Sequence, residues 1–402
     1  MASWATKIPA RFIDFGNKVL RSDNYVFGIK LVADGGGSGT WMYIDENENI
    51  VDLPDRYFEG HPTYKGITEV SYDGGLVCMV KFPKFYIRTA NGDKIWIAPD
   101  PTSVTNTQEE NERLVEDLKE RGFRLHPAFL TGYVNEGSKK EYDCFYVGAY
   151  PLSKNANGIA ESKGDTKALI EDNIEQYSVY CNNRNIGGVA GYHMWTIYEL
   201  SAIQLLALLE CKTTNFQKKY GAGRVNSTEI GMNNDTSANT GPASAKYRGV
   251  YCLWGNAWQL VDGIKTDSNN NLLLWAGDGR RDENEKRLYG TTDIKLPSKT
   301  SDTVTYAEGV TSGYYNRPLT DVGARYNCSD MFLPDFTTLT GRMDLGTYSD
   351  YVYCPAGTIE TLCAVGGYYN SGDEAGLFAY NFNINPAQRY YSVTSRLAKY
   401  DF

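Results

Sequence analysis

The 402-residue sequence predicts an α+β fold that begins with a small β-rich module. Strand-like runs at 76–90 and 93–98 flank Asn91-Gly92, a dipeptide typical of tight hairpins. Two helical segments further along begin with capping boxes, which mark helix N-termini. No run of about 18 apolar residues is present, and the first residues lack the apolar stretch of a secretory signal. We therefore expect neither membrane insertion nor an exported or lipid-anchored precursor.

Residues 1–56 are expected to form the β-rich module, which would serve attachment or assembly. The strand-like runs YVFGIKLVA (25–33) and TWMYI (40–44) enclose the glycine run at 35–39. These glycines predict either a flexible joint or a loop between two strands. The acidic DENEN run (45–49) lacks EF-hand spacing, which favours a solvated turn over a calcium site.

Three helices are expected in the domain that follows. The helix at 107–122 has a capping box formed by Thr107 and Glu110, and its thin apolar stripe places it at the surface. A second helix is expected over 167–183. The helix at 194–210 also begins with a capping box and is apolar nearly all round, which predicts a buried helix.

Residues 57–402 are expected to form one domain with a polar insertion. A strand is expected within 142–153, and the insertion, rich in Asn, Ser, Thr and Gly, covers about 212–246. Its length indicates a functional loop or an insertion rather than a plain connection. DSNNN (267–271) is interpreted as a hairpin turn, because Leu272 follows it where an EF-hand loop requires glycine.

The composition argues against several chemical functions. The net charge is −9 and no basic tract is present, so nucleic-acid binding is not expected. The eight cysteines contain no C-x-x-C and the three histidines no H-E-x-x-H, so no zinc site is expected. G-x-S-x-G and phosphate-binding loops are also absent. Asp278 with Asp282 or Glu283 could serve glycoside hydrolysis only in a suitable cleft, and solvated acids are the simpler interpretation. We expect no enzyme and no cofactor; a structural calcium ion stays open.

The unusual numbers are 31 tyrosines and 40 glycines. Tyrosine gives large, rigid contacts at low entropic cost, and Gly, Ser and Asn adapt around it, as in antibody paratopes. A β-rich fold whose strands favour aromatic residues would show the same excess. Composition leaves both interpretations open.

Three segments, taken in order, resemble a known family. They are MWTIYELSAIQLLALLE (194–210), LWGNAWQLVDG (253–263) and the terminal GGYYNSG, AGLF and SRLAKY motifs within 366–400. Together they resemble the C-type lectin fold of the formylglycine-generating-enzyme type. Within that fold they are most similar to the variable proteins of diversity-generating retroelements, which include phage tropism determinants. The resemblance covers about residues 76–402.

The W-G-N motif is interpreted as architectural. Trp254 and Trp258 are expected to pack on both sides of a turn at Gly255-Asn256, since large buried aromatic residues dominate core energetics.

The resemblance implies that adenine-directed mutagenesis rewrites codons of the terminal segment, about 366–395. A near-copy of this coding sequence beside a reverse transcriptase, differing mainly at adenines, would establish that mechanism. The residues expected to stay fixed and hold the fold are Gly366, Gly367, Gly372, Ala375, Gly376, Phe378, Arg396 and Leu397. The candidate ligand-binding residues are Tyr368, Tyr369, Asn370, Ser371, Asp373, Glu374, Tyr380, Asn381, Asn383, Arg389, Tyr390, Tyr391 and Ser392.

Two alternatives remain for this segment. It could be a Tyr-rich edge hairpin that binds nothing, and some members of the set, Tyr369 and Asn381 above all, could belong to the scaffold. An oxidase of the family would need two reactive cysteines five positions apart near the C-terminus. Here the late cysteines are Cys354 and Cys363, nine apart, so no catalytic residue is assigned.

The resemblance implies a non-enzymatic phage receptor-binding protein that sets host tropism. We expect an adhesin at the tail or fibre tip of the virion, made in the host cytoplasm, with a bacterial cell-surface protein or carbohydrate as receptor. A homotrimer is expected, attached to other virion proteins through residues 1–56. The alternatives are a diversified bacterial surface protein, a virion structural or head-decoration protein and, last, the oxidase.

Overall fold

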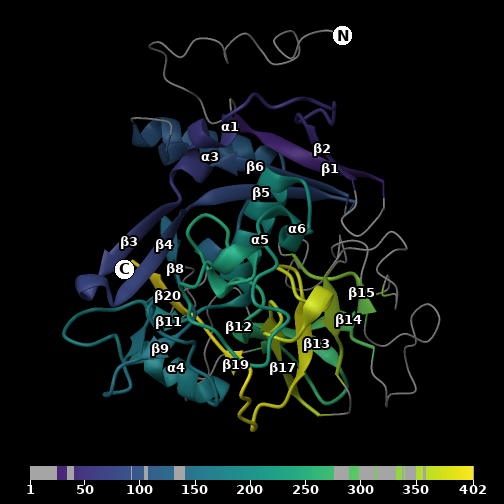
Figure 1. Ribbon diagram of the computed structural model, residues 1–402. Coiled ribbons are helices and arrows are strands. Elements are labelled where there is room, and N and C mark those ends of the chain that lie inside the picture. Colours follow the sequence, from purple (N-terminus) through teal and green to yellow (C-terminus); the bar gives the residue numbers. More distant parts are fainter. Residues whose placement is uncertain are drawn as a thin grey trace.

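The computed structural model describes residues 25–33, 40–91, 93–103, 107–130, 141–275, 289–297, 313–314, 332–336, 339, 350–355 and 359–401. They form several β-sheets with few helices, an α+β architecture in agreement with the predicted class (Figure 1). Residues 1–24, the glycine run at 35–39, and Asp278, Asp282 and Glu283 lie outside the described residues.

The first sheet is antiparallel and contains the predicted N-terminal strands. Its order is β2 (Thr40–Ile44), β1 (Phe27–Ala33), β6 (Lys94–Pro99), β5 (Phe85–Ala90) and β7 (Arg124–Leu125). The hairpin predicted at Asn91 joins β5 to β6, and Asn91 has a left-handed φ of 50°. Because β1 and β2 pair with each other, the intervening glycines connect two strands. β1 also pairs with β6, so the predicted boundary at residue 56 would separate strands that belong to the same sheet.

The run at 76–90 divides between two sheets instead of forming one strand. β4 (Val77–Pro83) belongs to the second sheet and β5 to the first, and the chain crosses between them at Lys84. Nζ of this buried lysine lies 2.9 Å from Glu141, 3.1 Å from Asp143 and 3.6 Å from Asp100. Burial alone would lower the pKa of Lys84, but these carboxylates outweigh it and raise the pKa. The buried ammonium group at the crossing between β4 and β5 is therefore paired with carboxylates.

The C-terminal segment supplies strands to both of the remaining large sheets. The second sheet has the order β11 (Tyr192–Met194), β20 (Leu397–Tyr400), β8 (Cys144–Gly148), β4 and β3 (Thr68–Tyr72). The third has the order β14 (Tyr289–Lys295), β13 (Asn271–Trp275), β12 (Trp258–Thr266), β17 (Thr361–Val365), β18 (Tyr380–Ile384), β16 (Tyr351–Tyr353) and β15 (Gly313–Tyr314), with β19 (Val393–Thr394) parallel to β12. β9 (Ser153–Lys154) and β10 (Ala160–Glu161) form a small hairpin.

Two predicted helices are confirmed, and one begins later than expected. The described helices are α1 (Tyr57–Gly60), α2 (Pro62–Lys65), α3 (Gln108–Glu120), α4 (Ile174–Asn182), α5 (Ile197–Cys211) and α6 (Phe216–Lys219). Thr107 caps α3 as predicted, accepting the Glu110 N–H at 3.2 Å. The helix predicted from 167 begins only at Ile174, because Asn173 caps it and Glu171 has a left-handed φ of 64°.

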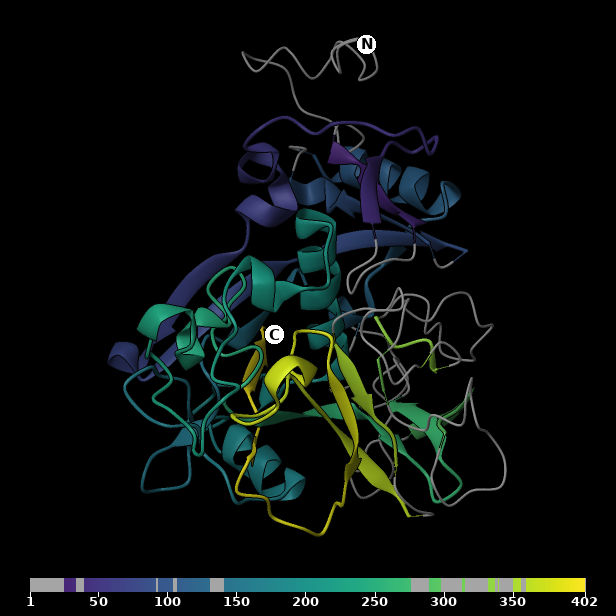
Figure 2. The same cartoon turned by 45° about the vertical axis from the view of Figure 1, so that its right-hand side comes forward.

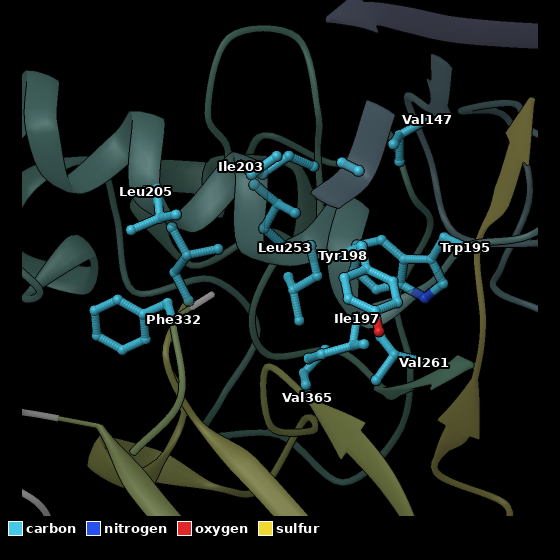
Figure 3. Close-up of a cluster of buried hydrophobic side chains, with 14 of the residues drawn as sticks. Val147, Trp195, Ile197, Tyr198, Ile203, Leu205, Leu253, Val261, Phe332 and Val365 are labelled. Carbon is cyan, nitrogen blue, oxygen red and sulfur yellow. The ribbon is translucent and has the colours of Figure 1, made fainter. Parts of the chain in front are cut away.

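α5 is the buried helix that the sequence predicted, and every residue from Ile197 to Leu209 is buried. Its capping box is formed as expected, with the Thr196 N–H donating to Glu199 at 2.7 Å. The close-up in Figure 3 shows α5 side chains such as Ile197 and Ile203 among Val147 of β8, Val261 of β12 and Val365 of β17. One hydrophobic core therefore joins the second and third sheets.

The DENEN (45–49) and DSNNN (267–271) runs both form turns, as predicted. The Asp267 carboxylate accepts the Asn269 and Asn271 N–H groups at 2.8 and 2.9 Å, and the turn joins β12 to β13. Asp45 accepts the Asn47 and Asn49 N–H groups in the same manner. No helix within the described ranges combines the length and the apolar character needed to cross a membrane.

His61 lies in a buried aromatic cage. The rings of Tyr25, Phe27, Tyr57 and Tyr64 have their centroids 5.2–5.7 Å from the imidazole. Nε2 donates to the Tyr25 carbonyl at 2.9 Å, whereas Nδ1 is buried and accepts no hydrogen bond within the described part of the chain. Burial lowers the pKa of His61 to about 3.

We predict that His61 makes the fold sensitive to acid. Its pKa is higher in the unfolded chain, so the unfolded state binds the proton first as pH falls below about 6.5. Its contribution is present above that pH and is lost as pH falls towards the folded pKa; the loss reaches about 3 kcal/mol by about pH 4. His61→Gln, which retains a donor for Tyr25, should flatten this part of the stability profile in urea unfolding. Tyr57→Phe, which keeps the imidazole, should not.

Candidate binding surface

The loop between β17 and β18 is closed by glycines. Gly366 has a φ of 92° and Gly367 a φ of 85°, a region that glycine enters without strain. The Gly376 N–H donates to the Gly366 carbonyl at 3.2 Å, and the Gly366 N–H donates to Ala379 at 3.1 Å. A Cβ at position 366 would lie 2.7 Å from the Leu253 carbonyl oxygen. These residues, predicted to be fixed, shape the base of the loop.

The W-G-N motif holds this loop, in agreement with its architectural interpretation. Gly255 and Asn256 both have left-handed φ angles, 67° and 62°, which make a tight turn. The buried Trp254 indole donates to the Gly221 carbonyl at 3.0 Å. The Gly255 N–H donates to Gly366 at 3.0 Å, and the Asn256 carbonyl accepts the N–H of Tyr369 at 3.1 Å.

The polar insertion at 212–246 packs against the same loop. The Ser227 N–H donates to the Tyr369 carbonyl at 2.7 Å, and the Gly372 N–H donates to Val225 at 3.0 Å. The Gln217 amide nitrogen donates to the carbonyls of Gly372, at 3.3 Å, and Ala375. The insertion therefore supports the terminal segment along one side (Figure 2).

Arg396 is a wholly buried cation whose described hydrogen bonds all go to neutral oxygens. Nε donates to the Gln259 side-chain oxygen at 2.9 Å and Nη1 to the Gly148 carbonyl at 2.8 Å. Nη2 donates to the carbonyls of Tyr251 and Cys252 at 2.8 and 3.3 Å. Burial lowers the pKa of Arg396 to about 10, so the side chain stays charged at neutral pH. This residue, predicted to be fixed, joins β8, β12 and the last strand.

The predicted ligand-binding residues differ in their exposure. The exposed ones are Asn370, Asp373, Asn383, Arg389 and Tyr391. The half-buried ones are Tyr368, Glu374, Asn381, Tyr390 and Ser392. Tyr369, Ser371 and Tyr380 are buried. Tyr391 is the most prominent apolar side chain of the segment, with 62% of its surface exposed.

Tyr380 is a core residue and is not part of a surface. Its hydroxyl lies 2.9 Å from the Gln204 side-chain oxygen and 2.7 Å from the Phe332 carbonyl oxygen. The strand YNFNI alternates, so Tyr380 and Phe382 face inward while Asn381 and Asn383 lie on the opposite side. The alternation of YNFNI already indicates in the sequence that Tyr380 faces inward, so its prediction as a ligand-binding residue is wrong.

Two further candidates are held by structural hydrogen bonds. The buried Ser371 hydroxyl accepts the Tyr368 N–H at 3.0 Å and closes a turn. The Tyr390 hydroxyl donates to the Gln388 side chain at 2.7 Å and accepts the Asn385 N–H at 3.1 Å. These hydrogen bonds stabilise the two loops.

An aromatic patch joins the terminal loops to two other segments of the chain. We define it by Tyr368, Tyr369, Tyr391, Ile170 and Ile230. The first two rings lie 5.0 Å apart at 63°, and Tyr369 packs on Ile230 with Ile170 alongside. Burial raises the pKa of the Tyr369 phenol, and the neighbouring Tyr391 and Tyr368 raise it further. Sequence reasoning missed Ile170 and Ile230, which come from distant loops and carry no local signal.

Charged residues lie on the segments that form the patch. The Tyr353 hydroxyl of β16 donates to the Glu374 carboxylate. The Glu171 N–H donates to the Tyr390 carbonyl at 3.1 Å, which places that glutamate beside the 385–392 loop. Neither Tyr353 nor Glu171 belongs to the residues predicted from the sequence.

The described residues contain no group of three or more His, Cys, Asp or Glu side chains arranged to hold a metal ion. Cys354 and Cys363 are both buried, and burial raises the pKa of each thiol. Neither sulfur therefore has the thiolate character that a reactive cysteine needs.

No protein-family model and no curated protein matches the chain. Among solved structures the chain is similar to Treponema denticola variable protein 1, with a TM-score of 0.34 and 10% identity, covering 83% of this chain and 99% of that chain. It is also similar to the U1 and P3c variants of Major Tropism Determinant, each with a TM-score of 0.30, at 10% and 9% identity, covering 90% of this chain and 92% of those chains. These names agree with the resemblance in the sequence, but similarity this low shows neither the family nor the function of the chain.

We predict that two glycines of the loop differ in their tolerance of a side chain. A Cβ at Gly367 would lie 2.6 Å from the Cβ and 2.8 Å from the Cα of Ala375, whereas at Gly372 the nearest atom is Oδ1 of Asn226 at 3.7 Å. Both have positive φ, so Gly372→Ala should cost about 1 kcal/mol and Gly367→Ala about 3 kcal/mol or more in urea unfolding. Equal costs would show that contact with Ala375 is not what requires glycine.

Proposed function

We propose that this chain is a non-enzymatic receptor-binding protein of a phage particle, built on a C-type lectin fold of the formylglycine-generating-enzyme type. In this proposal it displays a diversified surface rich in Tyr, Asn and Ser. It lies at the tail or fibre tip, is attached through its N-terminal residues, and binds a receptor on the bacterial cell surface.

The observation that carries the proposal is the division between buried and exposed residues in one short segment. Glycines, Ala375, Phe378 and Arg396 are held by the core, while Asn370, Asp373, Arg389 and Tyr391 are exposed. A surface of this kind can change its side chains while its backbone stays in place. Tyrosine and arginine are also enriched at interface hot spots.

The aromatic patch suits adhesion rather than catalysis. Its tyrosines provide contact area, and the exposed amides and carboxylates around it provide hydrogen bonds. One copy need not bind tightly, because several linked copies raise the effective concentration of the others.

We predict that the triple variant Asn370→Ala, Asp373→Ala and Tyr391→Ala loses binding to host cells. All three side chains are exposed, so the fold should be unaffected while the contact area is removed. We expect affinity to fall at least about a hundredfold, measured by adsorption of the labelled protein to cells.

The control removes three exposed side chains from α3, which lies beside the first sheet and away from the terminal loops (Figure 1). Glu109→Ala, Arg113→Ala and Glu120→Ala should leave adsorption unchanged. Full adsorption by the first variant would overturn the assignment of the surface.

We also propose a homotrimer, which would provide the linked copies. Mass photometry at micromolar concentration should then give a particle of three times the mass of one chain. A single monomer peak would contradict this part of the proposal.

A further inference from the structure

Three carboxylates lie on the segments that form the aromatic patch. Glu171 follows Ile170, a member of the patch, and its N–H bonds to Tyr390. Asp373 and Glu374 lie on the short turn that follows Tyr368 and Tyr369 in the same loop. The segments that form the patch therefore also carry negative charge.

These carboxylates are not neutralised within the described part of the chain. The ion pair next to the patch joins Lys167 to Glu229 at 3.1 Å and involves none of the three. Glu374 accepts a hydrogen bond from the neutral Tyr353 hydroxyl, which fixes the carboxylate and leaves its charge in place. Arg389 is the exposed positive group of the neighbouring loop, and no ion pair joins it to the three acids there.

The backbone of Glu171 is also strained. Its φ of 64° lies in the left-handed region, where glycine or asparagine is less strained than glutamate. The chain thus places an exposed carboxylate at a backbone position that disfavours it.

We propose that the patch recognises a cationic side chain, an arginine or lysine next to an apolar residue, on a protein partner. The inference rests on the proposed binding function. Tyrosine faces attract a guanidinium or ammonium group, and nearby carboxylates add charge-assisted hydrogen bonds. The apolar neighbour would pack against Tyr391 and Ile170. An anionic surface polysaccharide would instead meet like charge, which disfavours association.

The test uses selection from a random twelve-residue peptide library displayed on yeast, against the full chain. We expect arginine and lysine to be enriched beside apolar residues among the selected peptides. The neutralising variant Glu171→Gln, Asp373→Asn, Glu374→Gln keeps similar shapes, and it should bind the selected peptides about tenfold more weakly. Unchanged thermal unfolding would show that this variant is folded.

Two further variants separate the possible outcomes. Glu109→Gln, Glu112→Gln, Glu120→Gln removes the same charge from α3 and should not alter the peptide affinity. Tyr391→Ala should lose the selected peptides. If it binds them as well as the parent chain does, the peptides bind elsewhere and the proposed surface itself is wrong. Peptides that depend on Tyr391 but show no excess of basic residues, or binding unaffected by neutralisation, would overturn the cation inference alone.

Discussion

The architecture of this chain depends on the burial of one guanidinium group. Arg396 carries its charge into the core and donates to the oxygens of Gln259, Gly148, Tyr251 and Cys252. An unpaired buried charge would be strongly destabilising, and this one is tolerated because its donors are matched to acceptors. These acceptors lie in β8, in β12 and in the segment just before the W-G-N motif. The hydrogen bonds of Arg396 therefore tie the last strand to those three elements.

This arrangement anchors the terminal segment at both ends. β17 and β18 enter the third sheet before and after the first loop, and β19 and β20 follow the second loop into the core. Between these strands the outward side chains are small, polar or aromatic, and each inward one packs in the core. The division follows the two-residue period of a strand. Tyr380 packs in the core, while Asn381, whose Oδ1 accepts the Asn383 N–H at 2.8 Å, lies on the opposite face.

Features determined by interactions between neighbouring residues were predicted correctly from the sequence. Thr107 and Thr196 cap the expected helices, Asn91 begins the expected hairpin, and Asp267 closes the expected turn. Each of these features is decided by neighbours within a few residues. The predicted start of α4 was wrong, because the cap at Asn173 starts the helix at Ile174, after the apolar residues that had indicated an earlier start.

Features that depend on distant contacts were not predicted. No local pattern indicates that β1 pairs with β6, or that the chain changes sheets at Lys84. The same holds for the candidate surface: its terminal tyrosines are in the predicted set, whereas Ile170, Ile230 and Tyr353 come from other segments and are not. Long-range strand pairing is determined by packing throughout the core, and local sequence patterns do not specify that packing.

The contacts between the insertion and the terminal loop have a consequence for how such surfaces are inherited. Ser227, Val225 and Gln217 hold the backbone of the loop from outside the segment that carries the exposed residues. The conformation of the loop thus depends on both stretches, although more than a hundred positions separate them. Transfer of the terminal residues alone to a related scaffold would bring the side chains without their support, and genetic exchange should succeed most often when both stretches move together.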